Sequence, residues 1–303
     1  MNLRKFITYF SFVLVALMVC LPMRAQTKRA LLVGISDYGN PRENPNLWKN
    51  IHGANDVDLL LPVLSQKQGF KVKTLKDKGA TFKNIVAELG RLEKECRKGD
   101  IVYLHFSTHG QLVEDLNGDE PDRWDESIVP VDALLTGSKG KYEGENHLTD
   151  DKLSLLVSSI RKQVGPKGMV YVVLDACFSG DSSRGEDEYI RGTQKAFTRT
   201  GYVKINTKNR RNRNVKAFVK LDKSANYSHV TYIEACQADE VNTEIKDAST
   251  GKLYGPLSYH IASFLKEHEL DTSDKWVKSV QQQMRKDGRV RYQNMLVEST
   301  KNQ

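Results

Sequence analysis

Short runs of consecutive apolar residues, separated by stretches with helical periodicity, constrain the fold more than any other feature of this sequence. The two clearest runs are DIVYLHF (100–106) and GMVYVVL (168–174), in which almost every position is apolar. Strands of this kind are buried on both faces, which is typical of parallel sheets that carry helices on both sides. The sequence therefore predicts one α/β domain around a mainly parallel sheet.

The remaining elements follow the same alternation. Further strands are expected at 29–35, 70–75, 127–131 and 229–235, and helices at 55–68, 81–97, 149–162, 256–266 and 273–286. Thr81 and Thr149 are the expected N-caps of two of these helices. Residues 178–228 show little apolar periodicity and are too many for an ordinary connection, so we expect a long loop there.

The N-terminus has the pattern of a secretory signal peptide over residues 1–25. Two basic residues precede an apolar stretch from Phe6 to Leu21, and Ala25 supplies a small residue after it. Signals that are removed on export have this arrangement. A retained membrane anchor is the alternative, because the stretch is almost long enough to span a bilayer. We expect a secreted or periplasmic domain at 26–303, without stable membrane contact after cleavage.

The positive charge of the chain is concentrated in one segment. The formal net charge is +8, and removing three basic residues with the signal leaves +5. Residues 191–223 hold eleven Lys or Arg against one acid, a local net charge of +10, so the rest of the mature chain is net negative. A basic folded surface would favour nucleic acid, but basicity confined to a loop does not. We therefore expect no nucleic-acid partner.

The two most apolar strands each run into a reactive residue. The first continues into STHG, which contains His109 and Gly110, and the second into DACFSG, which contains Cys177. Because the carboxyl ends of parallel strands share one edge of a sheet, we expect these residues to lie close together. A thiolate can attack a carbonyl carbon while an imidazole transfers protons. The backbone N–H groups of Gly110 and Cys177 are the expected donors to the developing oxyanion.

These motifs resemble those of the caspase-like cysteine peptidases, most of all the metacaspase branch. STHG and DACFSG stand where that family has its catalytic His and Cys motifs, while DESIVPVD (125–132) and EACQAD (234–239) resemble two further family blocks. The resemblance covers about residues 28–265. It implies the caspase-like three-layer fold and a cysteine endopeptidase with His109 as general acid/base and Cys177 as nucleophile. True caspases carry QAC where this chain has DAC, which favours the metacaspase side.

The resemblance also implies an acidic S1 pocket formed by Asp56 and Asp175. Asp175 lies two residues before Cys177, so in a strand both side chains point to one face. Paired carboxylates attract Arg or Lys, and Arg is favoured by its bidentate geometry. Asp56 has a second interpretation as an acid in the first turn of a helix. The expected substrates are peptides and proteins with Arg or Lys at P1.

The basic loop, residues 181–228, is then a candidate for self-processing. An enzyme that prefers basic residues would find cleavage sites between Arg184 and Lys223 of its own chain. The candidate residues are Arg184, Arg191, Lys195, Arg199, Arg210 and Arg211. The alternative is a solvated loop that is not cut.

A group of acids between residues 112 and 126 offers hard oxygen ligands suited to calcium. The candidate ligands are Asp122, Asp125 and Glu126. Some metacaspases use calcium, so it is a candidate activator, although the Cys-His chemistry requires no cofactor. Glu120 stands where an EF-hand needs glycine, and no Cys/His spacing supports zinc.

Other functions remain open alongside the basic-specific peptidase. The same fold could cleave after Asp or Asn, although an Asp-specific pocket would need basic residues. An inactive caspase-like scaffold or binding module is a second alternative, because a fold alone does not fix a function. Such modules usually lack the His or the Cys, and this chain has both. A nucleic-acid binder would keep salt-dependent binding without Cys177.

Overall fold

A six-stranded sheet forms the centre of the part of the chain that the computed structural model describes, residues 26–178, 189–205, 223–290 and 293–301. The strands, in the order β13-β10-β7-β3-β1-β2, are β13 (Leu296–Ser299), β10 (His229–Glu234), β7 (Met169–Asp175), β3 (Ile101–Ser107), β1 (Lys28–Gly34) and β2 (Lys71–Lys76). All neighbours pair in parallel except β13, which is antiparallel to β10. The signal-peptide prediction lies outside the described residues.

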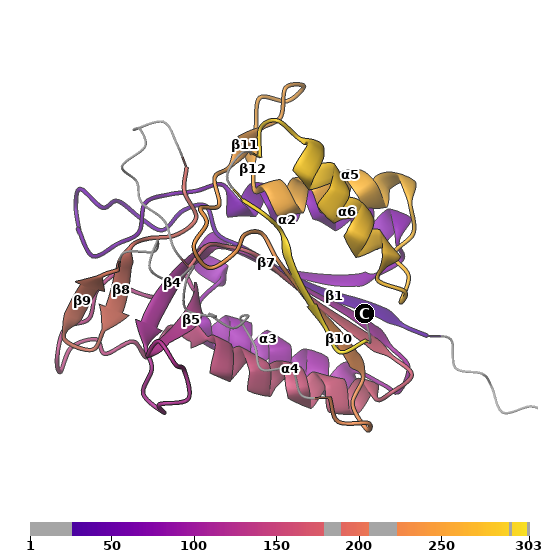
Figure 1. Ribbon diagram of the computed structural model, residues 1–303, viewed down its shortest axis with the longest axis horizontal. Helices are drawn as coiled ribbons and strands as arrows, with labels where there is room; N and C mark the ends of the chain where they lie inside the picture. The colour runs from indigo at the N-terminus through magenta and orange to yellow at the C-terminus, as the bar shows by residue number, and fades with distance from the viewer. Residues whose placement is uncertain (1–25, 179–188, 206–222, 291–292, 302–303) are drawn as a thin grey trace, which may run out of the picture.

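Helices cover both faces of this sheet (Figure 1). One face carries α3 (Phe82–Glu95) and α4 (Asp150–Val164), and the other carries α2 (Gly53–Pro62), α5 (Pro256–Glu267) and α6 (Lys275–Lys286). Alternate side chains of each central strand enter the two cores: in β3, Leu104 and Phe106 pack with the α3/α4 layer, and Ile101 and Tyr103 with the α2/α5/α6 layer. The predicted three-layer α/β fold is confirmed. No helix in the described ranges is long and apolar enough to cross a membrane.

The helix boundaries follow from local chemistry. The side chains of Thr81 and Thr149 accept hydrogen bonds from the N–H groups of Asn84 and Lys152, so both predicted N-caps are present. After α2 the chain widens into the π-helical turn η1 (Val63–Lys67), because Pro62 lacks an N–H for a regular helical hydrogen bond. A short 3₁₀ turn, η2 (Asp77–Gly79), follows β2.

A second sheet extends the carboxyl edge of the first. Its strands, in the order β6-β5-β4-β8-β9, are β6 (Leu148–Thr149), β5 (Trp124–Val129), β4 (His109–Glu114), β8 (Lys195–Thr198) and β9 (Gly201–Lys204). The β8–β9 hairpin differs from the expectation of a long loop, which therefore fails for residues 195–204. A two-stranded ribbon, β11 (Ile245–Lys246) and β12 (Leu253–Tyr254), lies above α2 in Figure 1.

Candidate active site

The predicted His and Cys motifs meet at the carboxyl edge of the central sheet. Strands β3 and β7 are parallel neighbours, and Ser107 pairs in register with Asp175. His109 and Cys177 each follow two residues later, and both are buried. Gly110 lies directly against this turn, because a Cβ at its position would stand 2.6 Å from the carbonyl oxygen of Cys177. The close approach explains why glycine occupies position 110.

His109 is held in one orientation by its surroundings. Its Nε2 lies 2.8 Å from the carbonyl oxygen of Lys49, and its ring stacks on Trp48 with centroids 4.9 Å apart. A carbonyl can only accept a hydrogen bond, so Nε2 must carry the proton, and Nδ1 of the neutral ring is an acceptor. Nδ1 is buried and has no hydrogen-bond partner among the described residues. Burial lowers the pKa of His109 to about 4, so the ring is neutral near pH 7.

The Cys177 thiol donates a hydrogen bond of 3.0 Å to the carbonyl oxygen of Glu240. A second thiol, that of Cys236, lies beside it. The hydrogen bond with Cys177, together with burial, raises the pKa of the Cys236 thiol well above its ordinary value. The Cys236 thiol therefore stays protonated near neutral pH.

Two backbone N–H groups converge on one carbonyl oxygen of the chain itself. The N–H groups of Gly110 and Cys177 donate hydrogen bonds of 3.0 and 3.1 Å to the carbonyl oxygen of Arg191. These are the two groups that the sequence indicated as oxyanion donors. The carbonyl group of Arg191 therefore lies against the backbone of both the His and the Cys motif.

The side chain of Arg191 fills a closed pocket whose walls are acidic. It is fully buried, and its guanidinium forms ion pairs with Asp56 at 2.8 Å, Asp175 at 3.4 Å and Glu244 at 2.8 Å. Asp56 also accepts a hydrogen bond from the Ser107 hydroxyl. We call these three acids and Ser107 the arginine pocket. Asp56 lies in the first turn of α2, and its carboxylate contacts the Arg191 guanidinium.

The three carboxylates differ in protonation. Burial raises the pKa of Asp175, but Arg191 and hydrogen bonds from Ser258 and Asn242 outweigh it and hold the pKa below its ordinary value. For Glu244, Arg191 likewise outweighs burial and keeps the pKa low. In Asp56 burial prevails over Arg191, and the pKa rises to about 7. The pocket therefore holds two firmly ionised acids and one that titrates near neutral pH.

The segment around Arg191 pairs with the chain after β10 as an added strand would. Ile190 forms an antiparallel bridge with Thr243, and the Arg191 N–H donates a 3.0 Å hydrogen bond to the carbonyl oxygen of Asn242. The Glu244 N–H returns a 3.0 Å bond to the carbonyl oxygen of Tyr189. Main-chain pairing of this kind aligns an extended peptide whatever its sequence, while pockets select its side chains.

Several members of this site were not among the predicted residues. Glu244, Asn242 and Ser258 contact Arg191 or Asp175. Gly255 closes the arginine pocket, since a Cβ there would collide with Asp175 and with Arg191. Asn242, Glu244 and Gly255 lie in irregular chain, where the sequence carries no periodic signal, and Ser258 lies in the first turn of α5. Among these residues only Glu244 had a signal in the sequence, because it is an acidic residue close to the EACQAD motif.

The other candidate residues have different positions. Lys195 lies on β8 and Arg199 in the exposed β8–β9 turn, away from the arginine pocket. Arg184, Arg210 and Arg211 lie outside the described residues. Of the predicted metal ligands, Asp125 has its carboxylate within 4.8 Å of those of Asp115 and Asp119. Asp122 and Glu126 are not part of this group of three acids, and calcium binding in this region stays a prediction.

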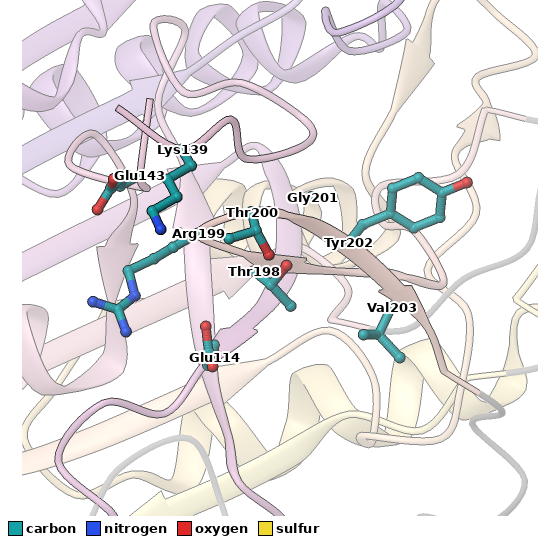
Figure 2. A pocket seen from close by; sticks show the side chains of 9 residues that line it. All are labelled: Glu114, Lys139, Glu143, Thr198, Arg199, Thr200, Gly201, Tyr202 and Val203. Carbon is teal, nitrogen blue, oxygen red and sulfur yellow. The ribbon is translucent and has the colours of Figure 1, made fainter. Parts of the chain in front are cut away.

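A second hollow lies at the opposite end of β4 from His109 (Figure 2). It lies on the β8–β9 turn and is lined by Glu114, Lys139, Glu143, Thr198, Arg199, Thr200, Gly201, Tyr202 and Val203. Glu114 lies five positions after His109 along β4, about 17 Å away at a rise of about 3.4 Å per residue. The hollow is therefore separate from the Cys-His site.

The sequence of this chain is similar to those of known metacaspases. A stretch of 164 residues is 31% identical to Metacaspase-1B of Aspergillus fumigatus and covers 50% of this chain and 35% of that protein. Metacaspase-1 of Kluyveromyces lactis is 30% identical over 164 residues, 50% of this chain and 33% of its own length. The match thus spans about a third of these relatives.

A solved structure supports the fold independently. Protein GSU0716 from Geobacter sulfurreducens superposes with a TM-score of 0.59 over 90% of this chain and 93% of its own, at 20% identity. The family model described as "Caspase domain" matches residues 27–302, nearly the whole described chain. With the paired His and Cys motifs at the edge of a parallel sheet, this match shows that the chain belongs to the caspase domain family.

Proposed function

We propose that the protein is a cysteine endopeptidase that cleaves after arginine, and less readily after lysine, with Cys177 as nucleophile and His109 as general acid/base. The observation that carries the proposal is the position of Arg191. Its side chain lies among three buried carboxylates, while its carbonyl oxygen accepts hydrogen bonds from the Gly110 and Cys177 N–H groups. A residue bound in this way presents its carbonyl carbon to a nucleophile with the oxyanion donors already in place.

The chemistry follows from these positions. Cys177 gives its thiol proton to Nδ1 of His109, and the thiolate forms a bond to the carbonyl carbon of the P1 residue. The Gly110 and Cys177 N–H groups stabilise the negative oxygen. The carbon–nitrogen bond then breaks, and His109 returns its proton to the departing amine. Water, deprotonated by His109, hydrolyses the thioester and restores the thiol.

The chain's own bond between Arg191 and Gly192 is the first substrate under this proposal. Arg191 is the one predicted processing residue that contacts the arginine pocket in the described part of the chain. Cleavage would free the pocket for other chains with basic P1 residues. The uncut protein is therefore a zymogen whose active site is occupied by its own sequence.

Export through a signal peptide belongs to the same proposal. A basic start, the apolar stretch from Phe6 to Leu21 and Ala25 support it. The described cysteines Cys96, Cys177 and Cys236 are all buried free thiols, a state that limits their oxidation outside the cytoplasm. The mass of the exported protein would test it, because removal of residues 1–25 gives a new N-terminus at Gln26.

The test of function compares wild type with Cys177→Ala on fluorogenic peptides ending in Arg, Lys, Asp or Asn, with intact masses recorded. Wild type should cleave after Arg and more weakly after Lys, and Cys177→Ala should lose at least about a thousandfold in kcat/KM. Cys96→Ala is the matched control, since Cys96 is a buried thiol at the end of α3, away from the site.

The masses should show a cut between Arg191 and Gly192 in wild type and in Cys96→Ala, and none in Cys177→Ala. A cut at another basic residue would contradict the assignment of Arg191. A folded wild type without any cleavage would favour the scaffold alternative.

A further inference from the structure

The two sides of the Arg191 guanidinium are bound by different acids. Nη1 contacts Asp56 at 2.8 Å, Asp175 at 3.4 Å and the Ser107 hydroxyl at 2.6 Å. Nε and Nη2 instead donate to one carboxylate oxygen of Glu244, at 3.1 and 2.8 Å. Glu244 therefore binds the side of the guanidinium that Asp56 and Asp175 do not.

Glu244 is fixed in this position by its contacts with His52. Its carboxylate accepts a 2.7 Å hydrogen bond from the His52 N–H and lies 2.6 Å from Nδ1 of the same residue. The side chain is fully buried. Its own N–H is engaged with Tyr189, so the residue that contacts the guanidinium also pairs with the main chain of the bound segment. A carboxylate held by so many bonds cannot move far to follow a different side chain.

A lysine side chain could satisfy only part of this arrangement. It ends in a single nitrogen and has no donor at the position of Nε. An ammonium that approaches Asp56, Asp175 and Ser107 leaves Glu244 without the two N–H donors that arginine supplies. Glu244 would keep its contacts with His52 but lose both donors from the guanidinium, so the lysine complex is weakened at Glu244 in particular.

We propose that Glu244 is the residue that makes the arginine pocket select arginine over lysine at P1. Asp56 and Asp175 attract either cation, whereas Glu244 recognises the planar Nε–Nη2 side of a guanidinium. The inference rests on the proposed peptidase function and adds a specificity-determining residue to it.

The experiment measures kcat/KM for matched peptides ending in Arg and in Lys. Arg191→Ala is built into every protein, so that the pocket starts empty without self-cleavage. Glu244→Gln should lower the Arg value about 100-fold and the Lys value about fivefold, a loss of about 20-fold in the Arg/Lys ratio. Asp56→Asn is the matched control, because it removes a carboxylate that both side chains reach, and should lower both values with a ratio change below about threefold.

Glu244→Asp is the second variant, and it keeps the charge but withdraws the carboxylate by one methylene. It should also lower the Arg/Lys ratio, and it decides the question if Glu244→Gln melts too low to assay. A ratio within about threefold of the parent in a folded Glu244 variant would overturn the inference while leaving the peptidase function intact. Cleavage of neither peptide by self-cleaved wild type would instead contradict the proposed function.

Discussion

Two groups of buried or half-buried acids in this molecule behave in opposite ways. In the arginine pocket, Arg191 holds the pKa values of Asp175 and Glu244 below their ordinary range against the effect of burial. At the start of β5, burial and neighbouring carboxylates raise the pKa of Asp125 to about 7, and at the start of α4 they raise the pKa of Asp150 to about 9. The comparison teaches that a cation supplied by the chain keeps two of the three pocket carboxylates ionised, whereas Asp56, where burial prevails over Arg191, has a raised pKa like Asp125.

The largest test of this comparison removes the internal cation. In a Cys177→Ala background, which cannot cut itself, Arg191→Ala should lower the free energy of unfolding by about 3 kcal/mol, because buried carboxylates lose their partner. Urea unfolding measures the change. Arg199→Ala is the control, since it removes the same charge from the exposed β8–β9 turn and should change stability by less than about 0.5 kcal/mol. Equal changes in the free energy of unfolding for Arg191→Ala and Arg199→Ala would show that the ion pairs of Arg191 do not stabilise the fold.

A second test adds a methyl group to the wall of the arginine pocket. The N–H of Gly255 donates a 3.0 Å bond to Asp56, and a Cβ at this position would meet Asp175 and the guanidinium. Gly255→Ala should therefore lower kcat/KM for Arg peptides about 100-fold. Gly201→Ala, where a Cβ meets nothing within 4 Å, should leave cleavage unchanged. Full activity of Gly255→Ala would mean that substrate arginine binds elsewhere.

A third test uses the acid whose protonation is balanced. With Arg191 in the pocket Asp56 has a pKa of about 7, and because Arg191 lowers that pKa, it is higher in the emptied pocket. An arginine substrate binds better to the negative form of Asp56, and kcat/KM should rise by up to about tenfold from pH 7 to pH 9. Asp56→Asn should lose this rise, while Asp58→Asn, an exposed acid on the same helix that pairs with Lys76, should keep it. A rise that survives in Asp56→Asn would assign it to another group.

The smallest expected effect concerns the acids of the β4–β5 region, for which we propose calcium as the bound cation. Asp115, Asp119 and Asp125 bring hard oxygen atoms together, and a divalent ion would return Asp125 to its ionised form. Millimolar calcium should raise the melting temperature by about 3 °C in wild type. It should not do so in Asp125→Asn, whereas Asp122→Asn should respond like wild type. An unchanged response in Asp125→Asn would reject the site.

The sequence predicted the parts of this molecule that depend on regular periodicity. The buried strands β3 and β7 and the N-caps Thr81 and Thr149 each have a local chemical signal, and the order of strands places His109 and Cys177 at one edge. β4 was missed because one residue, Thr108, separates it from β3 and no turn signal marks the boundary.

The site was predicted less completely for a physical reason. Asp56 lies in a helix and Asp175 at the end of a strand, and both elements have a periodic sequence pattern. Glu244 and Gly255 lie in irregular chain, whose path depends on packing. Glu244 lies 188 positions from Asp56 in the sequence yet shares one guanidinium with it. Long-range proximity of this kind has no local signature, so composition alone could suggest acids but not which acids meet.

Arg191 belongs to the same chain as Cys177, and this connection sets the kinetics of the proposed cleavage after Arg191. The segment already lies in the site, so the scissile bond and the thiol belong to one molecule and need no encounter. The maturation of each molecule should then be first order, with a half-time that does not change on dilution. Cleavage of any other chain must wait until this tethered arginine has withdrawn, so product formation from an added peptide should show a lag that is proportional to that half-time and does not change on dilution.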